Sequence, residues 1–503
     1  DSVLGQGNAD SNVGAIDGAD KWNYDDEVSY PFGYGLSYTT FEQTLDEVKV
    51  NMEDQTVTAT VTVTNTGDVA GKDVAQLYYS APYTDYNKEH KIEKSAIEFL
   101  AMEKTGKIAP GESETVTITA DAKYMTSWDS NAKEGKGGYI LDGGDYYFAI
   151  GDDAHDAVNN ILKAHGEKVN GNEALVKKET IGNEGEVDES TFAKSENGTE
   201  VVNQLQDADI NYYKEGYATY LSRQDWAGTF PRKYDDLTID GPLSDEWVKK
   251  LSNEIYQFNQ NGNVAIEGTD YGLVLSDLAG ADISDERFDQ LVAQIPLDTL
   301  IAKITKGGSV SDVIPEILSP LVYQNDGPNG FANVISSRGE FADDENADYH
   351  MATMANLVTL GNTFNKDLVL EWGQLMGNDG LMSNNLLIWS VGANVHRSAY
   401  NGRNFEYYSE DDMLSNYMAA ATVAGALEKG VMVGPKHFAF NDQETQRSGV
   451  AVYMTEQKAR EGDLRAFQGS FEDVKGLAAM ASFTRIGATP INGSVAILDN
   501  ILR

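Results

Sequence analysis

From residue 237 to its end, the chain alternates helical segments with short apolar runs. Helical spacing of apolar residues over 409–429 is followed by the run 431–435, and 386–391 is another run of the same kind. Short apolar runs separated by helices are typical of βα units, whose strands lie parallel in one sheet. The sequence therefore predicts an α/β domain of the barrel type over 237–503.

The other elements of this region continue the alternation. A capping pattern at Ser409 and Asp412 predicts the start of the long helix, and Gly430 predicts its end. Further helices are predicted over 285–304, with a break at Pro296, over 349–376 and over 455–471, and further strands over 319–324 and 477–483.

About four or five strands can be counted in this way, whereas a closed (β/α) barrel needs eight. The last residues have the pattern of the middle of a helix, and the chain begins without an initiator Met. An unclosed barrel leaves a long edge that is open to pairing. We therefore expect the barrel to be incomplete at its C-terminal end, and the chain to be a segment of a longer protein.

Residues 40–155 have a different pattern, in which short strands alternate with turn residues. The stretch 57–63 (VTATVTV) alternates β-branched with small residues, and further strand candidates occur at 74–79, 114–118 and 146–150. Such spacing predicts an antiparallel β-sandwich about the size of one immunoglobulin-like module. For this module we favour the role of a structural spacer over ligand binding.

Two segments show no regular pattern. Residues 1–39 are mostly polar loop and end in the glycine- and aromatic-rich stretch YPFGYGLSYT. Residues 156–236 mix acidic, Gly-rich and Asn/Thr-rich stretches, and we expect them to form a connector that runs over the surface.

The chain is strongly acidic, since 38 basic and 80 acidic side chains give a net charge of −42. Such a surface repels nucleic acid and anionic membranes but is compatible with a neutral ligand such as a sugar, although adaptation of solubility explains most of the charge. The absence of cysteine excludes disulfides and thiolate ligands. No apolar run of about 18 residues predicts a membrane span, and no signal peptide is visible, so a cytoplasmic and a secreted location both stay open.

Polar residues gather where four of the predicted strands end. The richest stretch is KHFAFNDQETQR (436–447), which follows an apolar run and contains one of the six histidines of the chain. The other strand ends carry Asp326, Arg403 with Glu406, and the stretch 483–485. Residues at the C-terminal ends of barrel strands form the active sites of such folds, and these donors and acceptors suit a polyhydroxylated ligand. Each stretch alone is more often a charged loop, but together they favour a binding site.

Several of these motifs resemble glycoside hydrolase family 3. HRSAYNGRNFEYYSED (396–411), KHFAFNDQETQR, DGPNG and INGSVAILDNILR (491–503) resemble the barrel domain of that family. YPFGYGLSYTTF, VTVTNTGDVAGKDVAQLYYSAP and IAPGESETVTI resemble its fibronectin type III-like domain. Here that domain precedes the barrel, as in the circularly permuted β-glucosidase-like members, in which an α/β sandwich comes first.

The resemblance implies a multidomain chain with four parts. These are the tail of an α/β sandwich domain (1–39), a fibronectin type III-like β-sandwich (40–155), a connector (156–236), and an α/β TIM-type barrel that is incomplete at its C-terminal end (237–503).

The family implies hydrolysis of terminal non-reducing β-linked sugars by a retaining, two-step mechanism, with two carboxyl groups about 5–5.5 Å apart. The nucleophilic Asp is expected just beyond Arg503 and the acid/base Glu upstream of Asp1, so this segment alone is expected to be inactive. The resemblance implies no metal and no cofactor. Expected partners are a small neutral saccharide or β-glycoside and either a second copy or the remaining segments of the same protein, but neither nucleic acid nor membrane.

The resemblance also implies substrate-binding residues, namely Asp326, Arg403, Lys436, His437 and Arg447. Asp326 is expected to accept hydrogen bonds from two sugar hydroxyls, while the basic residues donate to hydroxyls or orient Asp326. Arg447 is expected near the nucleophile and the 2-hydroxyl. His396, Glu406 and Phe483 are expected to support these residues from behind.

Two points leave an alternative open. Phe483 stands where the family has a Tyr, which removes an expected hydrogen bond to the nucleophile, and Thr484 with Arg485 is a candidate replacement. Neither catalytic carboxylate is identifiable in the chain. A second hypothesis is therefore a non-catalytic carbohydrate-binding or scaffold protein.

Lys436 and His437 raise a geometric problem. Neighbouring side chains of a regular strand point to opposite faces, yet both residues are expected to face one sugar. We therefore predict a β-bulge or a non-proline cis peptide bond between Lys436 and His437.

Overall fold

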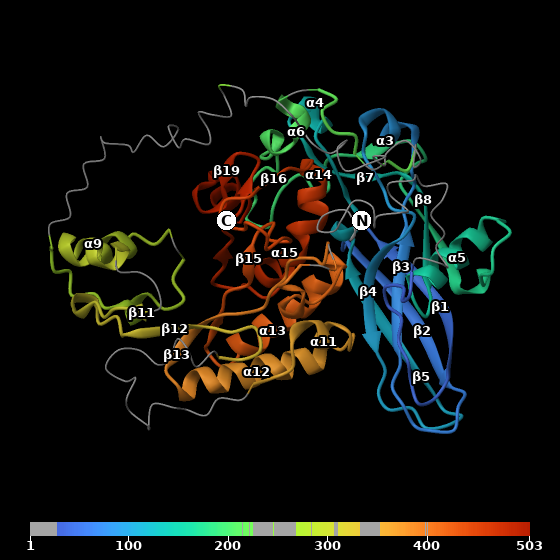
Figure 1. Cartoon of the computed structure of the whole chain (residues 1–503), viewed down its shortest axis with the longest axis horizontal. Coiled ribbons are helices and arrows are strands. Elements are labelled where there is room, and N and C mark those ends of the chain that lie inside the picture. Colours follow the sequence, from blue (N-terminus) through green and yellow to red (C-terminus); the bar gives the residue numbers. More distant parts are fainter. Residues whose placement is uncertain are drawn as a thin grey trace.

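The computed structural model describes part of the chain, and every structural statement below refers to this part. It comprises residues 28–213, 215–220, 222–224, 245, 268–282, 284–305, 310–331, 353–397, 399 and 401–502. Most of the expected tail of an α/β sandwich domain lies outside it, and so do residues 225–236 at the end of the expected connector. Figure 1 shows a β-sandwich on the right and a region of helices and short strands beside it.

The sandwich consists of seven strands in two antiparallel sheets. One sheet has the order β1 (Phe41–Asn51), β2 (Thr56–Asn65), β5 (Ser113–Asp121), and the other has the order β4 (Glu98–Lys104), β3 (Val74–Ser80), β8 (Gly144–Ile150), β9 (Val176–Ile181). The strands predicted at 57–63, 74–79, 114–118 and 146–150 are confirmed. In β2 the small and β-branched side chains at alternate positions point into the core, since Val57, Ala59 and Val61 are at most 1% exposed.

The sandwich continues past residue 155, where the sequence predicts its end. Helix α5 (Ala154–Ala164) follows β8 directly, and β9 then pairs antiparallel with β8. Strand β9 is an edge strand with the sequence VKKETI, in which only Ile181 is buried. Because its residues are mostly polar, β9 lacks the alternation of apolar residues by which strands are predicted from sequence. The predicted connector therefore begins with an element of the sandwich.

The second region contains parallel strands. Strands β12 (Val322–Asp326), β13 (Asn385–Trp389) and β14 (Met432–Val433) pair in parallel, and so do β15 (Lys436–Phe438) and β17 (Met480–Ala481). A parallel bridge between Gly392 and Lys436 connects the two sets. Helices α12 (Lys366–Met382), α13 (Asp412–Leu427) and α15 (Arg465–Glu472) lie between the strands along the chain. The predicted alternation of helices with parallel strands is confirmed.

Several boundaries differ from the prediction for local reasons. Asp411 caps α13 instead of the predicted pair, because its side chain accepts a hydrogen bond from Leu414 N at 2.7 Å. The hydroxyl oxygen of Ser409 accepts from Asp411 N at 3.0 Å and so supports the cap from two residues earlier. The described part of the predicted helix 349–376 consists of α11 (Leu357–Gly361) and α12, separated by the cap residue Asn365.

Other predicted elements are shorter or divided. The region 285–304 forms α8 (Arg287–Ala293) and α9 (Leu297–Thr305), which Pro296 separates as predicted. The region 455–471 is one helical segment in which α14 (Glu456–Lys458) passes through the π-helical turn Ala459–Asp463 into α15. The stretch that follows β14 is itself a strand, β15, so Lys436 and His437 belong to a strand and not to a loop.

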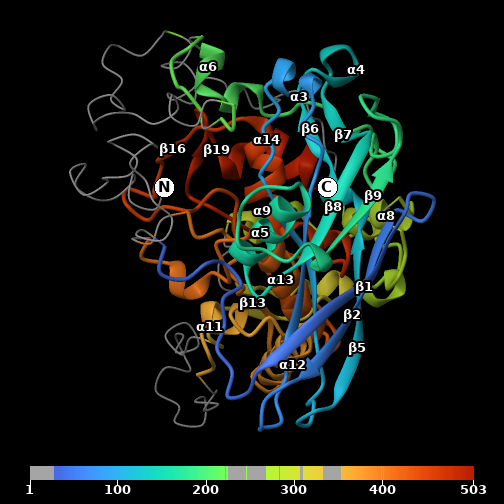
Figure 2. The same ribbon diagram turned by 90° about the vertical axis from the view of Figure 1, so that its right-hand side faces the viewer.

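The sandwich and the helical region share one buried core. The ring of Phe32 lies 5.5 Å from that of Phe99 in β4 and 5.7 Å from that of Phe364, which precedes α12. Tyr417 in α13 donates its hydroxyl hydrogen to Leu100 O at 2.9 Å. Figure 2, seen from the side of the sandwich, has the strands in front of these helices. Within the described residues, no helix is both long enough and apolar enough to cross a membrane.

Candidate functional site

The candidate site forms where three segments meet beside the parallel strands. Asp326 is the last residue of β12, Lys436 is the first of β15, and Arg403 immediately precedes the 3₁₀ turn Asn404–Glu406. Gly392 allows this meeting, because a Cβ atom at its position would lie 2.2 Å from Glu406 O. The segment that carries Arg403 can therefore lie directly against the extension of β13.

Direct ion pairs connect the first half of the site. Lys436 Nζ lies 2.7 Å from Asp326 Oδ1 and 3.3 Å from Glu406 Oε2. The other carboxylate oxygen of Glu406 pairs with Arg403 Nε. Lys436 and Glu406 are each 1% exposed at the side chain, whereas Asp326 is 40% exposed. Of these groups, Asp326 is the one that presents a carboxylate to solvent.

The ion pairs continue through Glu444. Its Oε1 atom lies 3.6 Å from Arg403 Nη1 and accepts a hydrogen bond from Asn441 Nδ2 at 2.9 Å. Its Oε2 atom accepts from Arg447 Nη1 at 3.0 Å, and the Arg447 side chain is 37% exposed. We call the whole set the ion-pair series; in order, it is Asp326, Lys436, Glu406, Arg403, Glu444 and Arg447.

The ion-pair series alternates in sign and has no formal net charge. Lys436 and Glu406 are buried, Arg403 and Glu444 are partly buried, and the two more accessible ends are a carboxylate, Asp326, and a guanidinium, Arg447. Burial lowers the pKa of Lys436, and the neighbouring Asp326 carboxylate opposes this shift. A carboxylate and a guanidinium held in place by ion-pair partners can bind hydroxyl groups without moving.

His437 adjoins the series and is also buried. It is 6% exposed, its backbone N–H donates to Asn394 Oδ1 at 2.7 Å, and its Nε2 atom lies 3.1 Å from Arg403 Nη2. Burial, together with the charges of Arg403, Lys436 and Arg447, lowers the pKa of His437 to about 2. The imidazole is therefore neutral at physiological pH.

The peptide bond between Lys436 and His437 is cis, as predicted. Both side chains contact the Arg403–Glu406 pair, Lys436 through Glu406 and His437 through Arg403. A second non-proline cis peptide bond, between Phe438 and Ala439, was not predicted.

His396, Glu406 and Phe483, which were expected to support the binding residues, lie in different parts of the site. Glu406 lies at the centre of the ion-pair series. His396 Nε2 lies 2.9 Å from Tyr407 O, and burial lowers the pKa of His396. Phe483 is 59% exposed, and the Arg447 guanidinium lies 5.4 Å from its ring centre. The structure therefore brings the five predicted binding residues into one group and sets Phe483 at its Arg447 end.

Some residues of the group are absent from the sequence prediction. Glu444 and Asn441 lie inside the motif 436–447, and Tyr407 inside 396–411, but their partners are far away in sequence. Asn394, which donates a hydrogen bond to His437 O, lies just before the motif 396–411. The motifs contain these residues without revealing which atoms they contact. Among the described residues, no cluster of three or more His, Asp or Glu side chains could hold a metal ion.

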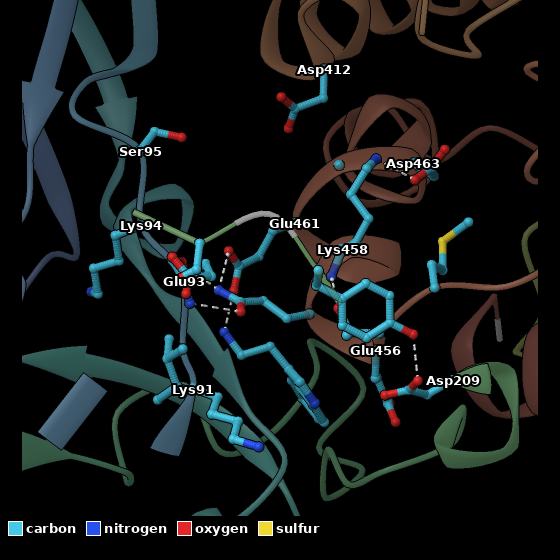
Figure 3. A pocket seen from close by; sticks show the side chains of 18 of the residues that line it. Lys91, Glu93, Lys94, Ser95, Asp209, Asp412, Glu456, Lys458, Glu461 and Asp463 are labelled. Atoms are coloured by element: carbon cyan, nitrogen blue, oxygen red, sulfur yellow. Dashed lines mark hydrogen bonds and ion pairs between the residues drawn. The ribbon is translucent and has the colours of Figure 1, made fainter. Parts of the chain in front are cut away.

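A large cavity lies apart from the ion-pair series, between the sandwich and the start of α13. Its volume is 2290 Å³, and Figure 3 shows Glu93 and Ser95 from the sandwich side across from Asp412 and Glu461 of the helical region. Arg397 and Asp442, which form an ion pair with each other, line its wall close to the motif 436–447. We call this space the interdomain cavity.

Comparison with protein families identifies two domains. Residues 349–503 match the glycosyl hydrolase family 3 N terminal domain, and residues 73–154 match the fibronectin type III-like domain.

Curated relatives match almost the whole chain. A β-glucosidase of Ruminococcus albus is 28% identical over 498 residues, which cover 95% of this chain and 45% of that protein. β-Glucosidase A of Butyrivibrio fibrisolvens is 29% identical over 496 residues, which cover 95% and 55%. The chain thus spans about half the length of the curated relatives that it matches.

A solved structure shares the fold. The crystal structure of a β-glucosidase from Paenibacillus barengoltzii superposes with a TM-score of 0.65 over 95% of this chain and 47% of that one, at 24% identity. The chain therefore resembles the β-glucosidases of glycoside hydrolase family 3, and its match to the fibronectin type III-like domain lies ahead of its match to the hydrolase domain.

Proposed function

We propose that this β-glucosidase-like segment of glycoside hydrolase family 3 supplies the glycone-binding residues of an enzyme that hydrolyses terminal non-reducing β-linked sugars. We further propose that hydrolysis is retaining, with two steps, and that the hydrolase region is part of a (β/α) barrel. The observation that carries the proposal is the ion-pair series, whose accessible ends offer a carboxylate at Asp326 and a guanidinium at Arg447.

Each end of the series has a chemical role toward a neutral sugar. The Asp326 carboxylate accepts hydrogen bonds from two neighbouring hydroxyls, and Lys436 holds it in place through a contact of 2.7 Å. Arg447 donates to hydroxyls at the other end, and Arg403 donates between them. Because the series is neutral as a whole, it recognises a neutral ligand through hydrogen bonds and not through net charge.

Neither catalytic carboxylate is assigned to a residue of this chain, and the positions expected for them stay predictions. What this chain contributes is binding and orientation of the glycone. Rigid orientation alone lowers the barrier of a bimolecular reaction considerably, which makes a preformed subsite useful for catalysis.

Binding and turnover test the proposal separately. We expect isothermal titration calorimetry to detect glucose binding by this chain, and the full-length protein to hydrolyse aryl β-glycosides. Asp326→Asn should weaken glucose binding at least tenfold, because hydrogen bonds to a charged acceptor contribute about 1.5–3 kcal/mol. Asp68→Asn, at an exposed turn of the sandwich, is the matched control and should bind normally.

The outcomes separate the two hypotheses. Glucose binding without turnover of gluco-, xylo- or galacto-substrates by the full-length protein would favour a non-catalytic carbohydrate-binding protein. Equal glucose affinity of the Asp326→Asn variant and the unaltered chain would contradict the proposal that the ion-pair series binds glucose.

A further inference from the structure

We propose that the interdomain cavity is a second carbohydrate-binding site, which holds a neutral oligosaccharide where the sandwich meets the helical region. The cavity lies apart from the ion-pair series, so its occupation does not depend on the function proposed for that series. The sandwich, for which the sequence favours a structural role, gains a role in ligand binding as well.

Three parts of the chain form the walls of the cavity. The sandwich contributes residues between 88 and 99 and between 128 and 131, the segment 205–224 contributes a second wall, and residues between 410 and 465 of the helical region contribute the third. Figure 3 shows Ser95 and Asp412 on opposite sides of this space. Ligand pockets occur preferentially at such interfaces between domains.

Hydrogen bonds between the walls fix the shape of the cavity. The backbone N–H group of Glu93 donates to Gln457 Oε1 at 3.1 Å, and Gln457 Nε2 donates to Glu93 O at 2.7 Å. Leu205 N donates to Glu456 Oε2 at 2.9 Å and so connects the second wall to the third. A pocket that is fixed in this way loses little conformational entropy when a ligand binds.

The helical wall contains an irregular turn at the cavity. The π-helical turn Ala459–Asp463 carries Glu461 and Asp463, and both side chains line the cavity. Trp128 N of the sandwich donates a hydrogen bond to the Glu461 carboxylate. Single π-helical turns inside α-helices are frequent at functional sites. Here the turn brings Glu461 into contact with the sandwich.

The size of the cavity favours a ligand of several sugar units. Its volume of 2290 Å³ is well above the range of about 300–1,000 Å³ in which pockets hold drug-sized ligands. A monosaccharide would leave most of this space to water, whereas linked sugar units fill a larger part of it.

The charges at the cavity favour a neutral ligand. Lys458 Nζ pairs with Asp463 Oδ2 at 2.6 Å, so part of the charge is neutralised inside the wall. Burial raises the pKa of Asp412 to about 6 and that of Glu461 to about 7, although Arg465 opposes both shifts. A protonated carboxyl group both donates and accepts hydrogen bonds, as a sugar hydroxyl does. Ionised acids at the same place repel an anionic ligand.

Aromatic side chains of the second wall add apolar contact. Tyr212 and Tyr220 line the cavity and are 57% and 36% exposed. The hydroxyl group of Tyr220 donates to Asp209, which holds the ring in place. An exposed tyrosine offers a flat apolar face together with a polar hydroxyl. Such a ring can pack against the C–H groups of a sugar unit while carboxyl groups on the opposite wall bind its hydroxyls.

Calorimetry with cellotetraose, a neutral oligosaccharide, tests the cavity. The Asp326→Asn variant of this chain is the starting protein, so that the ion-pair series contributes little to the measured binding. We expect one cellotetraose molecule to bind per chain. Ala96→Trp, at an exposed residue of the sandwich wall, should fill the space and lower the affinity at least tenfold. Asp412→Leu, on the opposite wall, should lower it three- to tenfold.

The matched control is Ala109→Trp. Ala109 is also an exposed alanine of the sandwich, but it lies in a turn outside the lining of the cavity. This variant should change the affinity for cellotetraose less than twofold. Equal losses in Ala96→Trp and Ala109→Trp would overturn the proposal.

Two further results would overturn the proposal. One is the absence of cellotetraose binding to the Asp326→Asn chain. The other is binding of spermine, but not of cellotetraose, that Ala96→Trp removes, because it would assign the cavity to a cationic ligand. Failure of glucose to bind the ion-pair series contradicts only the proposed function, since the cavity is tested with that site weakened.

Discussion

The ion-pair series and the acidic groups at the interdomain cavity are two clusters of charge that this fold builds differently. In the series, Lys436 lies 2.7 Å from Asp326 and 3.3 Å from Glu406, so each carboxylate has a direct partner. At the cavity, Arg465 is the cation with the largest effect on Asp412 and Glu461, but within the described residues it forms no ion pair within 4.0 Å with either.

This difference in distance changes the protonation of the cavity acids. Burial raises the pKa values of Asp411 and Asp412, which also repel each other. Burial raises the pKa of Glu461 to about 7, and Arg465 opposes this shift only in part. Direct pairing offsets the cost of burying a charge, whereas a cation at longer range leaves the acids to take up protons.

The largest expected effect comes from breaking the ion-pair series. Lys436→Met leaves Asp326 and Glu406 without their shared cation, and Glu406 is buried. We expect a loss of about 3–5 kcal/mol in the free energy of unfolding, measured by urea denaturation, because removing one partner of a buried ion pair is costly and only Arg403 then pairs with Glu406.

The control for this variant is Lys475→Met. Lys475 pairs with Glu196 at the surface, where the two side chains are 68% and 53% exposed. Loss of a surface pair should cost under about 1 kcal/mol. Similar losses for Lys436→Met and Lys475→Met would contradict the contrast between buried and exposed pairs.

The second effect concerns the cation at the interdomain cavity. Arg465→Met removes the positive charge near Asp412 and Glu461, so both carboxylates become harder to ionise. We expect a loss of about 2–3 kcal/mol at pH 8, and a smaller loss at pH 5, where these groups are protonated. Thermal unfolding at both pH values measures the difference, and an equal loss at the two would rule out an electrostatic cause.

The third effect is the contribution of Glu461 alone to the pH dependence of stability. Its pKa is 4.5 in the unfolded chain and about 7 in the folded one, so the folded state binds the proton more tightly. This preference stabilises the fold below pH 4.5, and the gain is lost as the pH rises to 7. Because the carboxyl is only partly buried, we expect the pH dependence to amount to about 1–2 kcal/mol.

Glu461→Gln should remove this part of the pH dependence. The variant should unfold at nearly the same temperature at pH 5 and pH 7.5, apart from contributions of other groups, and be no less stable than the unaltered chain at the higher pH. Glu112→Gln, at an exposed turn, should leave the pH profile unchanged. A profile of Glu461→Gln that parallels that of the unaltered chain would exclude Glu461 as a titrating group.

The smallest effect is expected at Phe483, which stands at the Arg447 end of the ion-pair series. Because Phe483 is 59% exposed, Phe483→Tyr should change the free energy of unfolding by less than about 0.5 kcal/mol. The ring of Tyr would still face the Arg447 guanidinium, so we expect glucose affinity to change less than twofold. A larger gain in affinity, measured by calorimetry, would indicate that the Phe weakens the site.

Local patterns in the sequence were sufficient for most elements of the fold. The alternation in 57–63 predicts β2, and the break at Pro296 separates α8 from α9. The polar edge strand β9 was missed, because only Ile181 of its side chains is buried and its pairing with β8 rests on backbone hydrogen bonds and on polar contacts of Lys178 and Thr180 with Asp145. The amino-acid composition of an exposed edge strand therefore gives little indication that the strand pairs with a sheet.

The candidate site shows the same limit. Asp326, Arg403 and Lys436 could be named from their motifs, and the cis bond after Lys436 from the need to turn two neighbouring side chains to one side. The role of Glu444 could not be predicted in this way, since it depends on contact with Arg403, which lies on another segment.

The sequence by itself determined the elements, their order and the residue types of the site, because periodicity, turn residues and short motifs are local properties of a chain. Only the tertiary structure decided which of these charges touch. Lys436 reaches Asp326 across 110 residues, and the directions of the hydrogen bonds around His437 depend on Arg403 and Tyr407 from a different segment. Electrostatic energy depends on distances of a few ångströms, and such distances exist only after the chain has folded.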